Sequence, residues 1–206
     1  MKIQIIGNGS FGSFLMELLN PIFEITDDAP SVILAVPISA YDELGAKFKS
    51  KHLINVCSVQ KPSMDILLKY TDQVTGIHPL FGSRTPENKR NSILTYSCIN
   101  DNDTWQSGGI EVDFLNKFKK VSKIIDSFSG NATHIKLNPE YHDILMRKTH
   151  VNALIGAKQL QTYIEVAKDI PDELIPHSFR LMREFVKTLD DMPKGTIESI
   201  MANPYF

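Results

Sequence analysis

The chain reads Lys2-Ile3-Gln4-Ile5-Ile6-Gly7-Asn8-Gly9-Ser10-Phe11-Gly12 near its start, and this stretch decides the fold. A short apolar run passes directly into a glycine-rich turn. Apolar side chains then recur at positions 11, 14, 15, 18 and 19, which is the spacing of one helix face. The stretch therefore predicts a strand, a tight turn and a helix in immediate succession.

The glycine-rich turn has the spacing of a loop that holds a pyrophosphate. In such a loop the first glycine allows the tight turn, the second lets the backbone approach the phosphates, and the third lets helix and strand pack closely. The amino end of the helix adds amide donors and the positive end of its dipole. We therefore predict a dinucleotide-binding loop whose cofactor-binding residues are Gly7, Asn8, Gly9, Ser10, Phe11 and Gly12.

Further strands and helices alternate behind this first unit. Apolar runs typical of strands lie at 22–25, 32–36, 53–58, 74–77, 92–97 and 133–137, and helical spacing is found at 62–68 and 112–128. The run Val32-Ile33-Leu34-Ala35-Val36 is apolar throughout, as expected for a parallel strand covered on both faces, and Pro37 ends it. The alternation predicts an α/β fold, with a Rossmann-type doubly wound sheet over residues 1–137.

Residues 138–206 contain only helical patterns. Asn138 can cap a helix that has Pro139 at its first position, and few breakers follow before about residue 168. Pro171 and Pro176 bracket a turn, after which helical patterns reach residue 189 and recur at 196–201. We expect a small all-helical domain, 138–206. Because it has little core of its own, a homodimer through these helices would bury the apolar faces that a monomer exposes.

Charge and composition argue against several classes of partner. The chain has 22 basic and 24 acidic residues among 206, and no run of like charge resembles a nucleic-acid or membrane footprint. No apolar stretch reaches the roughly 18 residues of a membrane span. The two cysteines, Cys57 and Cys98, lie in or directly after apparent strand sequence, so a disulfide framework is not expected. We expect a soluble, cytoplasmic protein with a small-molecule ligand and no metal site.

The residue that would bind the adenosine ribose is expected about 20 residues after the loop, at the end of the second strand. Asp27 and Asp28 lie there. The same residues, followed by Ala29 and Pro30, also read as a simple turn into the next strand, and both interpretations stay open. No arginine stands nearby to accept a 2′-phosphate, which favours NAD over NADP.

Several segments together resemble the prephenate and arogenate dehydrogenases. They are the glycine loop, the 32–37 strand, Asn55-Val56-Cys57-Ser58-Val59-Gln60-Lys61, Gly76-Ile77-His78-Pro79-Leu80-Phe81-Gly82 and Glu140-Tyr141-His142-Asp143. The resemblance covers nearly the whole chain in order. It implies an enzyme of tyrosine synthesis that uses NAD(P) for an oxidative decarboxylation, with Val36 and Pro37 also at the cofactor. It does not say which of the two substrates is used.

The resemblance also implies roles for single residues. A hydroxyl that becomes a carbonyl must lose its proton, and a neutral imidazole is a suitable acceptor near physiological pH. His78 matches the family's histidine in this role, and Ser58 matches the serine beside the reacting hydroxyl. Ser83 falls where a hydroxyl residue touches the substrate. Arg180 matches a helix arginine that grips a carboxylate, although a solvated basic face would look the same.

Some positions depart from the family pattern. Gln60, which we expect at the substrate, stands where many members have an anchoring lysine. His150 is also expected at the substrate, as a substitute for a histidine that the family carries about one turn further on. His142 and Asp143 are expected to organise the start of their helix, and the helical domain is shorter than in the family. Two alternatives remain: a related reductase of another small acid or imine, and a dinucleotide-binding protein without catalysis.

Overall fold

The structure is a computed structural model that describes residues 2–97, 111–112, 123–124, 126–127 and 134–206. The chain divides into two compact units, Met1–Asp143 and Ile144–Phe206. The sequence places this division after residue 137 instead. The first unit reaches Asp143 because His142 and Asp143 form hydrogen bonds with His78 and with the backbone at Gln60.

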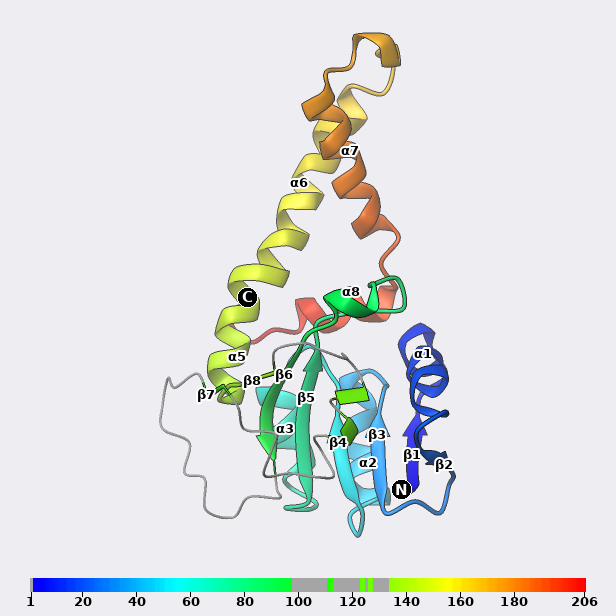
Figure 1. Cartoon of the computed structure of the whole chain (residues 1–206). Helices are drawn as coiled ribbons and strands as arrows, with labels where there is room; N and C mark the ends of the chain where they lie inside the picture. Colours follow the sequence, from blue (N-terminus) through cyan, green and yellow to red (C-terminus); the bar gives the residue numbers. More distant parts are fainter. Residues whose placement is uncertain (1, 98–110, 113–122, 125, 128–133) are drawn as a thin grey trace. The chain divides into compact units, whose positions relative to one another are not determined.

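The first unit is built on a sheet that has eight strands among the described residues, in the order β2-β1-β3-β4-β5-β6-β8-β7 (Figure 1). The strands are β1 (Lys2–Ile6), β2 (Glu24–Ile25), β3 (Ser31–Leu34), β4 (His52–Asn55), β5 (Val74–Pro79), β6 (Ser92–Ser97), β7 (Glu111–Val112) and β8 (His134–Lys136). The first five strands are parallel, β6 runs antiparallel to β5, and β7 runs antiparallel to β8. The predicted Rossmann-type sheet is thus confirmed.

Helices cover both faces of this sheet: α1 (Ser10–Leu19) on one, and α2 (Tyr41–Lys47) and α3 (Lys61–Leu67) on the other. Successive strand residues point to opposite faces, so neighbours in sequence enter different cores. Ile33, Ile54 and Ile77 pack with α1, whereas the residues just before the first two, Val32 and Leu53, pack with α2 and α3. This explains why β3 and the middle of β4 have apolar residues on both faces.

The structure adds one helix that was not expected, and it corrects the start of another expected helix. Helix α2 was not expected, because it has only seven residues, and Gly45 interrupts its apolar spacing. The glycine is needed for packing, since a Cβ at Gly45 would lie 2.5 Å from the Tyr70 ring. Residues 111–112 form β7, although a helix was expected to begin near residue 112. The rest of that expected helix lies mainly outside the described part of the chain, but Ile124 is buried in the core on the α1 face.

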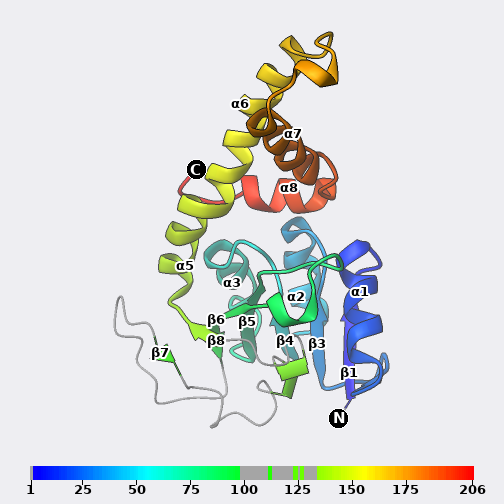
Figure 2. The same ribbon diagram turned by 45° about the horizontal axis from the view of Figure 1, so that its top comes forward.

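The second unit is helical, as expected. Its elements are the end of α5 (Pro139–Met146), a π-helical segment (Arg147–Val151), α6 (Asn152–Val166), α7 (His177–Asp190) and α8 (Lys194–Met201). Three short 3-10 turns also occur in the described chain, at Ile38–Ala40, Glu87–Lys89 and Asp172–Leu174. Helices α6 and α7 form an antiparallel pair (Figures 1 and 2). Val151, Leu154 and Ile200 form the core of this unit.

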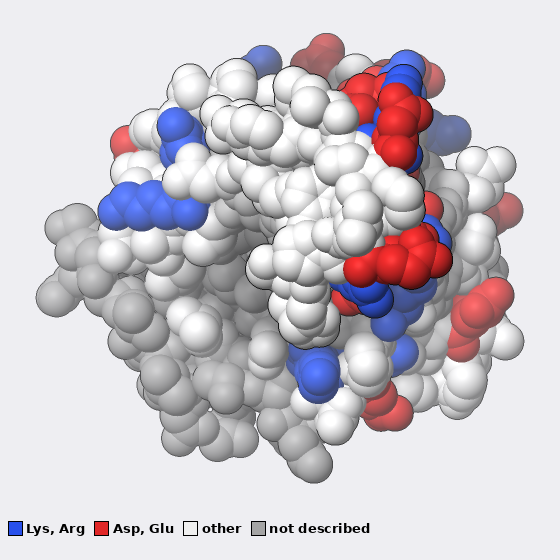
Figure 3. Space-filling model, turned by 90° about the horizontal axis from the view of Figure 1, so that it is seen from above, with Lys and Arg blue, Asp and Glu red and all other residues white. Residues whose placement is uncertain are grey.

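Basic and acidic side chains lie next to one another on the face shown in Figure 3. This mixture agrees with the near balance of charges in the sequence. Within the residues that the structure describes, no helix is both long and apolar enough to cross a lipid bilayer.

Candidate active site

The carboxyl ends of the parallel strands bring most of the predicted site residues to one edge of the sheet. The glycine loop follows β1, Val36 and Pro37 follow β3, Ser58 follows β4, and His78 lies near the end of β5. Strands β4 and β5 pair with Asn55 beside Gly76, so Ser58 and His78 both lie beyond this pair. In open α/β sheets, ligands bind at this edge.

The glycine loop is shaped by its neighbours at two positions and open at the third. Gly7 has a φ of +125°, and a Cβ there would lie 2.2 Å from the Ala35 carbonyl oxygen. A Cβ on Gly12 would lie 2.2 Å from the Gly7 carbonyl oxygen. Around Gly9, by contrast, no described atom beyond its chain neighbours lies within 4 Å of a Cβ, and no side chain caps α1. The loop therefore presents backbone to open space, as pyrophosphate binding requires.

His78 is part of a buried chain of hydrogen bonds. Its Nδ1 lies 2.8 Å from Nε2 of His142, and Nδ1 of His142 lies 2.7 Å from Oδ1 of Asp143. The two rings meet edge to face, with centroids 5.0 Å apart. His78 is 2% exposed, and His142 and Asp143 are fully buried. A buried polar row of this kind is stable only because each member has a partner.

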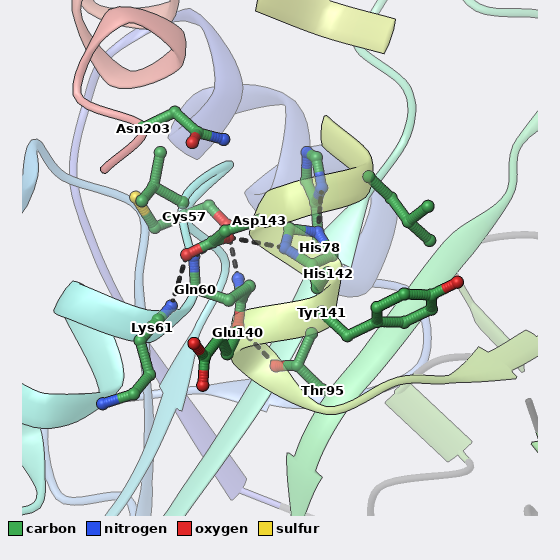
Figure 4. Close-up of polar contacts among 12 residues, drawn as sticks. Cys57, Gln60, Lys61, His78, Thr95, Glu140, Tyr141, His142, Asp143 and Asn203 are labelled. Carbon is green, nitrogen blue, oxygen red and sulfur yellow. Dashed lines mark hydrogen bonds and ion pairs between the residues drawn. The ribbon is translucent and has the colours of Figure 1, made fainter. Parts of the chain in front are cut away.

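Asp143 is held in place by the backbone of a different helix. Oδ1 accepts a hydrogen bond from the Gln60 amide and Oδ2 one from the Lys61 amide, both at 2.8 Å (Figure 4). These amides begin α3, which has no side-chain cap from its own sequence. The carboxylate thus takes the part of an N-cap, supplied by α5.

These contacts define which ring nitrogens carry protons when both histidines are neutral. With Asp143 as the carboxylate, both of its oxygens accept from backbone amides, and Oδ1 also accepts from Nδ1 of His142, which then carries the proton. Nε2 of His142 then accepts, and Nδ1 of His78 donates to it. The proton-accepting lone pair of His78 is therefore on Nε2.

Gln60, which the sequence proposes for substrate binding, has its side chain within the protein interior. Its Oε1 accepts from Asn55 at 3.3 Å and from Thr95 at 2.6 Å, and its Nε2 donates to the Cys57 carbonyl. The side chain lies over Gly76, where a Cβ would come within 2.5 Å of Oε1. A lysine in this position would bury a charge among these groups, so the glutamine suits the network.

Asn55 connects this network to Tyr41 of α2. Tyr41 is fully buried, and its hydroxyl donates to Asn55 Oδ1 at 2.8 Å. Burial raises the pKa of Tyr41 well above its ordinary value, and the nearby Cys57 thiol adds to the shift. The phenol therefore stays protonated in the folded protein, as a donor.

The Tyr41 shift predicts a loss of stability at high pH. Below about pH 10 the phenol is protonated in both states, so its contribution is complete; as the pH rises further, only the unfolded state ionises freely and stability falls. Tyr41→Phe should lower the free energy of unfolding by about 1–3 kcal/mol near neutral pH and flatten its decline above pH 10. Urea unfolding across this range tests it, with Tyr163→Phe, an exposed tyrosine, as control. Equal declines in wild type and Tyr41→Phe would contradict the shift.

Asp27 is not brought to the glycine loop. Strand β2 has only two residues and ends level with Ile3, four residues before Gly7. Gln4 donates to the Asp27 carboxylate at 3.1 Å, and Lys51, which directly precedes β4, donates to the Asp27 carbonyl at 3.0 Å. These contacts join Asp27 to the amino ends of the strands. Asp28 is exposed in the same turn.

The segment between β5 and β6 lies beside α1. Phe81 packs against Phe11 and Phe14, with ring centroids 6.4 and 6.3 Å apart. The Arg90 guanidinium lies over the Phe14 ring at 5.1 Å and donates to the Thr85 carbonyl. Phe11 is thus a packing residue of the loop that the sequence assigned to the cofactor. Ser83 is exposed at the tip of this segment.

Arg180 and His150 belong to the second unit. Arg180 donates to the carbonyl oxygens of Ile175 and Asp172, at 3.2 and 2.8 Å, and so holds the turn before α7. His150 lies in the π-helical segment. The role proposed for each in substrate binding stays a prediction.

The sequence assigned His142 and Asp143 to the wrong task. The start of α5 is capped by Asn138, whose Oδ1 accepts from the amides of Glu140 and Tyr141. A helix that already has a good N-cap does not need Asp143 for that purpose. An acidic residue that its own helix does not need, directly after a histidine, was the only indication in the sequence that this pair has another role.

Comparison with known proteins supports the same fold. No protein-family model and no curated protein matches the sequence. Prephenate dehydrogenase from Aquifex aeolicus, solved with hydroxyphenyl propionate and NAD+, has a TM-score of 0.67 and 16% identity over 100% of this chain and 83% of that chain. Arogenate dehydrogenase from Synechocystis has a TM-score of 0.60 and 15% identity over 100% and 84%. An imine reductase from Myxococcus stipitatus with NADP+ has 0.58 and 13% over 98% and 76%. The resemblance inferred from the residues thus extends to the fold.

Proposed function

We propose that the protein is an NAD(P)-dependent oxidoreductase that oxidatively decarboxylates prephenate or arogenate. The observation that carries this proposal is the buried row Asp143, His142, His78 at the carboxyl edge of the sheet. It gives His78 a proton-accepting nitrogen near the strand ends that hold the glycine loop. The similarity in fold to prephenate and arogenate dehydrogenases supports the same reaction.

A nicotinamide dinucleotide fits the residues of this edge. The loop at Gly7–Gly12 would hold its pyrophosphate through backbone amides. Gly7 and Gly12 allow the tight turn, and Gly9 leaves open space beside the backbone where the phosphates can approach. Val36 and Pro37 follow β3 beside this loop. When bound, the cofactor supplies the acceptor for a hydride. We propose NAD or NADP as this cofactor, because Asp27, whose sequence surroundings favour NAD, is bonded to Gln4 and Lys51 away from the loop.

The proposed reaction has one proton that the protein must handle. As a hydride leaves the ring carbon that bears the hydroxyl, Nε2 of His78 takes the hydroxyl proton and the carbon becomes a carbonyl. The ring carboxylate then leaves as carbon dioxide, and its bonding electrons make the ring aromatic. The resulting phenolate takes the proton back from His78. Ser58, whose partly exposed hydroxyl has no hydrogen bond to the described chain, would hold the reacting oxygen.

A direct assay tests this function. Purified protein is mixed with NAD or NADP and with prephenate or arogenate, and formation of reduced cofactor is followed together with release of carbon dioxide. We expect reduced cofactor and carbon dioxide in equal amounts with at least one pair. If the protein binds a dinucleotide but neither substrate reduces it, the assignment fails, and a protein that binds the dinucleotide without catalysis is the better description.

A second candidate is the reduction of an imine or of another small acid. The similarity in fold to the imine reductase supports it. The two functions differ in direction: the first starts from oxidised cofactor and releases carbon dioxide, whereas the second consumes reduced cofactor. Loss of NADPH with a cyclic imine, in the absence of any reaction with prephenate or arogenate, would favour this candidate.

We further propose a cytoplasmic homodimer that pairs through the second unit. Large apolar side chains are exposed there, at 63% for Tyr163, 82% for Val166, 72% for Leu174 and 50% for Leu181. So many exposed apolar groups on a small unit mark an interaction surface. Leu181→Asp should therefore shift sedimentation velocity from dimer toward monomer, whereas Lys187→Gln on the same helix should not. A monomeric wild type at micromolar concentration would contradict the proposal.

A further inference from the structure

We infer that His142 and Asp143 are positioning residues that fix the tautomer of His78, with its proton on Nδ1 and its lone pair on Nε2. The inference rests on the proposed function for its catalytic meaning. It concerns residues that do not touch the substrate and act only through His78. Their task is to present the proton-accepting nitrogen of His78 before any substrate arrives.

The position of the carboxylate is the first step of the argument. Two backbone amides, of Gln60 and Lys61, each bind a different oxygen of Asp143 at 2.8 Å. Backbone amides can only donate, and they are fixed at the start of α3. The carboxylate is therefore held in one place and in one role, without help from the histidines.

The second step is the direction of the two hydrogen bonds that follow. A fixed acceptor at 2.7 Å from Nδ1 of His142 requires a proton on that nitrogen. The lone pair of neutral His142 then lies on Nε2, 2.8 Å from Nδ1 of His78. A histidine's tautomer is set by the partner of its other nitrogen. The carboxylate thus determines the state of His78 through His142.

The third step is the charge that the reaction creates. When His78 takes a proton, a cation forms at a buried side chain, which is costly unless a counter-charge is near. Asp143 supplies that charge through His142. In the Ser-His-Asp triad a buried aspartate likewise holds a histidine in one tautomer and stabilises its imidazolium. Here a second imidazole stands between the two groups, so the carboxylate acts from one residue further away.

An ordinary structural role would explain the same contacts differently. In that case His142 fills space and satisfies the α3 amides through its neighbour, and the tautomer of His78 would not depend on it. The variant His142→Leu distinguishes the two interpretations, because leucine fills a similar volume but has no acceptor for Nδ1 of His78. His142→Gln restores an acceptor, because its amide oxygen can reach the place of Nε2.

The test is nitrogen-15 NMR of the histidine rings at about pH 8, where ordinary imidazoles are neutral. Comparison with His78→Asn assigns the His78 signals. We expect wild-type His78 and His142→Gln to carry the proton on Nδ1, and His142→Leu to show a mixture or the other tautomer. A wild-type proton on Nε2, or an unchanged tautomer in a folded His142→Leu, would overturn the inference.

The NMR result needs no substrate, so it stands even if the proposed reaction is not observed. Where turnover is found, kcat of His142→Leu should fall on the order of tenfold to a hundredfold, with the KM for the dinucleotide unchanged and most of the loss recovered in His142→Gln. His177→Gln, at an exposed histidine of α7, serves as control. A fall in kcat that His142→Gln does not recover would also count against the tautomer role.

Discussion

Gly9→Ala is expected to leave the protein folded and to weaken dinucleotide binding, whereas Gly12→Ala should unfold or severely destabilise the first unit. The two glycines are three residues apart in one loop, yet their surroundings differ. A Cβ on Gly12 would lie 2.2 Å from the Gly7 carbonyl oxygen, and the backbone would have to move to admit it. Overpacking of this kind costs about 1–3 kcal/mol, and more where backbone is the obstacle.

At Gly9 a Cβ meets no described atom within 4 Å, so the folded protein should accept alanine. The methyl group would instead occupy space that we assign to the pyrophosphate. A steric cost of about 1–3 kcal/mol on the complex corresponds to on the order of tenfold to a hundredfold weaker binding.

Calorimetric titration with NAD and NADP, together with urea unfolding, measures both effects. Gly156→Ala, a helical glycine of α6 with no described atom within 4 Å of its Cβ, serves as the control for substitution itself. If Gly9→Ala binds both dinucleotides as tightly as the wild type, the loop does not hold the pyrophosphate. A stable Gly12→Ala would mean that helix and loop are less closely packed than the structure shows.

The glycine loop was predictable because its signal is local. A turn that needs a positive φ at Gly7 and close backbone contact at Gly12 admits only one residue type at each place, so the sequence shows it directly. The apolar run at 32–36, which contains most of β3, is an equally clear signal, since both faces of that strand are buried. These features define the sheet and the edge at which His78 lies.

The partners of His78 were harder to predict because they come from distant parts of the chain. His142 is 64 residues from His78, and the amides that hold Asp143 are more than 80 residues away from it. No spacing rule reports such contacts. At Asp27 a spacing rule applied, but the structure does not follow it. Asp27 lies at the distance from the loop in sequence that is expected of a ribose ligand, yet β2 ends after two residues and the Asp27 carbonyl accepts a hydrogen bond from Lys51.

His78→Asn is expected to lower kcat on the order of a hundredfold to ten-thousandfold while dinucleotide binding stays the same. General base catalysis by a positioned side chain contributes about that much. The variant removes the ring nitrogen that we propose takes the hydroxyl proton. Because His78 lies on β5 and not in the glycine loop, the affinity for the dinucleotide should stay unchanged while kcat falls.

Asparagine is the informative replacement because it separates catalysis from folding. Its amide nitrogen reaches about where Nδ1 of His78 lies and can still donate to His142, so the buried row keeps its last hydrogen bond. An alanine would leave Nε2 of His142 buried without a donor and add a cavity, and a lost rate would then have two explanations. Measured beside His177→Asn, a folded His78→Asn that turns over at the wild-type rate would remove His78 from the chemistry. The proposal that the glycine loop binds a dinucleotide would still stand, since cofactor binding does not depend on Nε2 of His78.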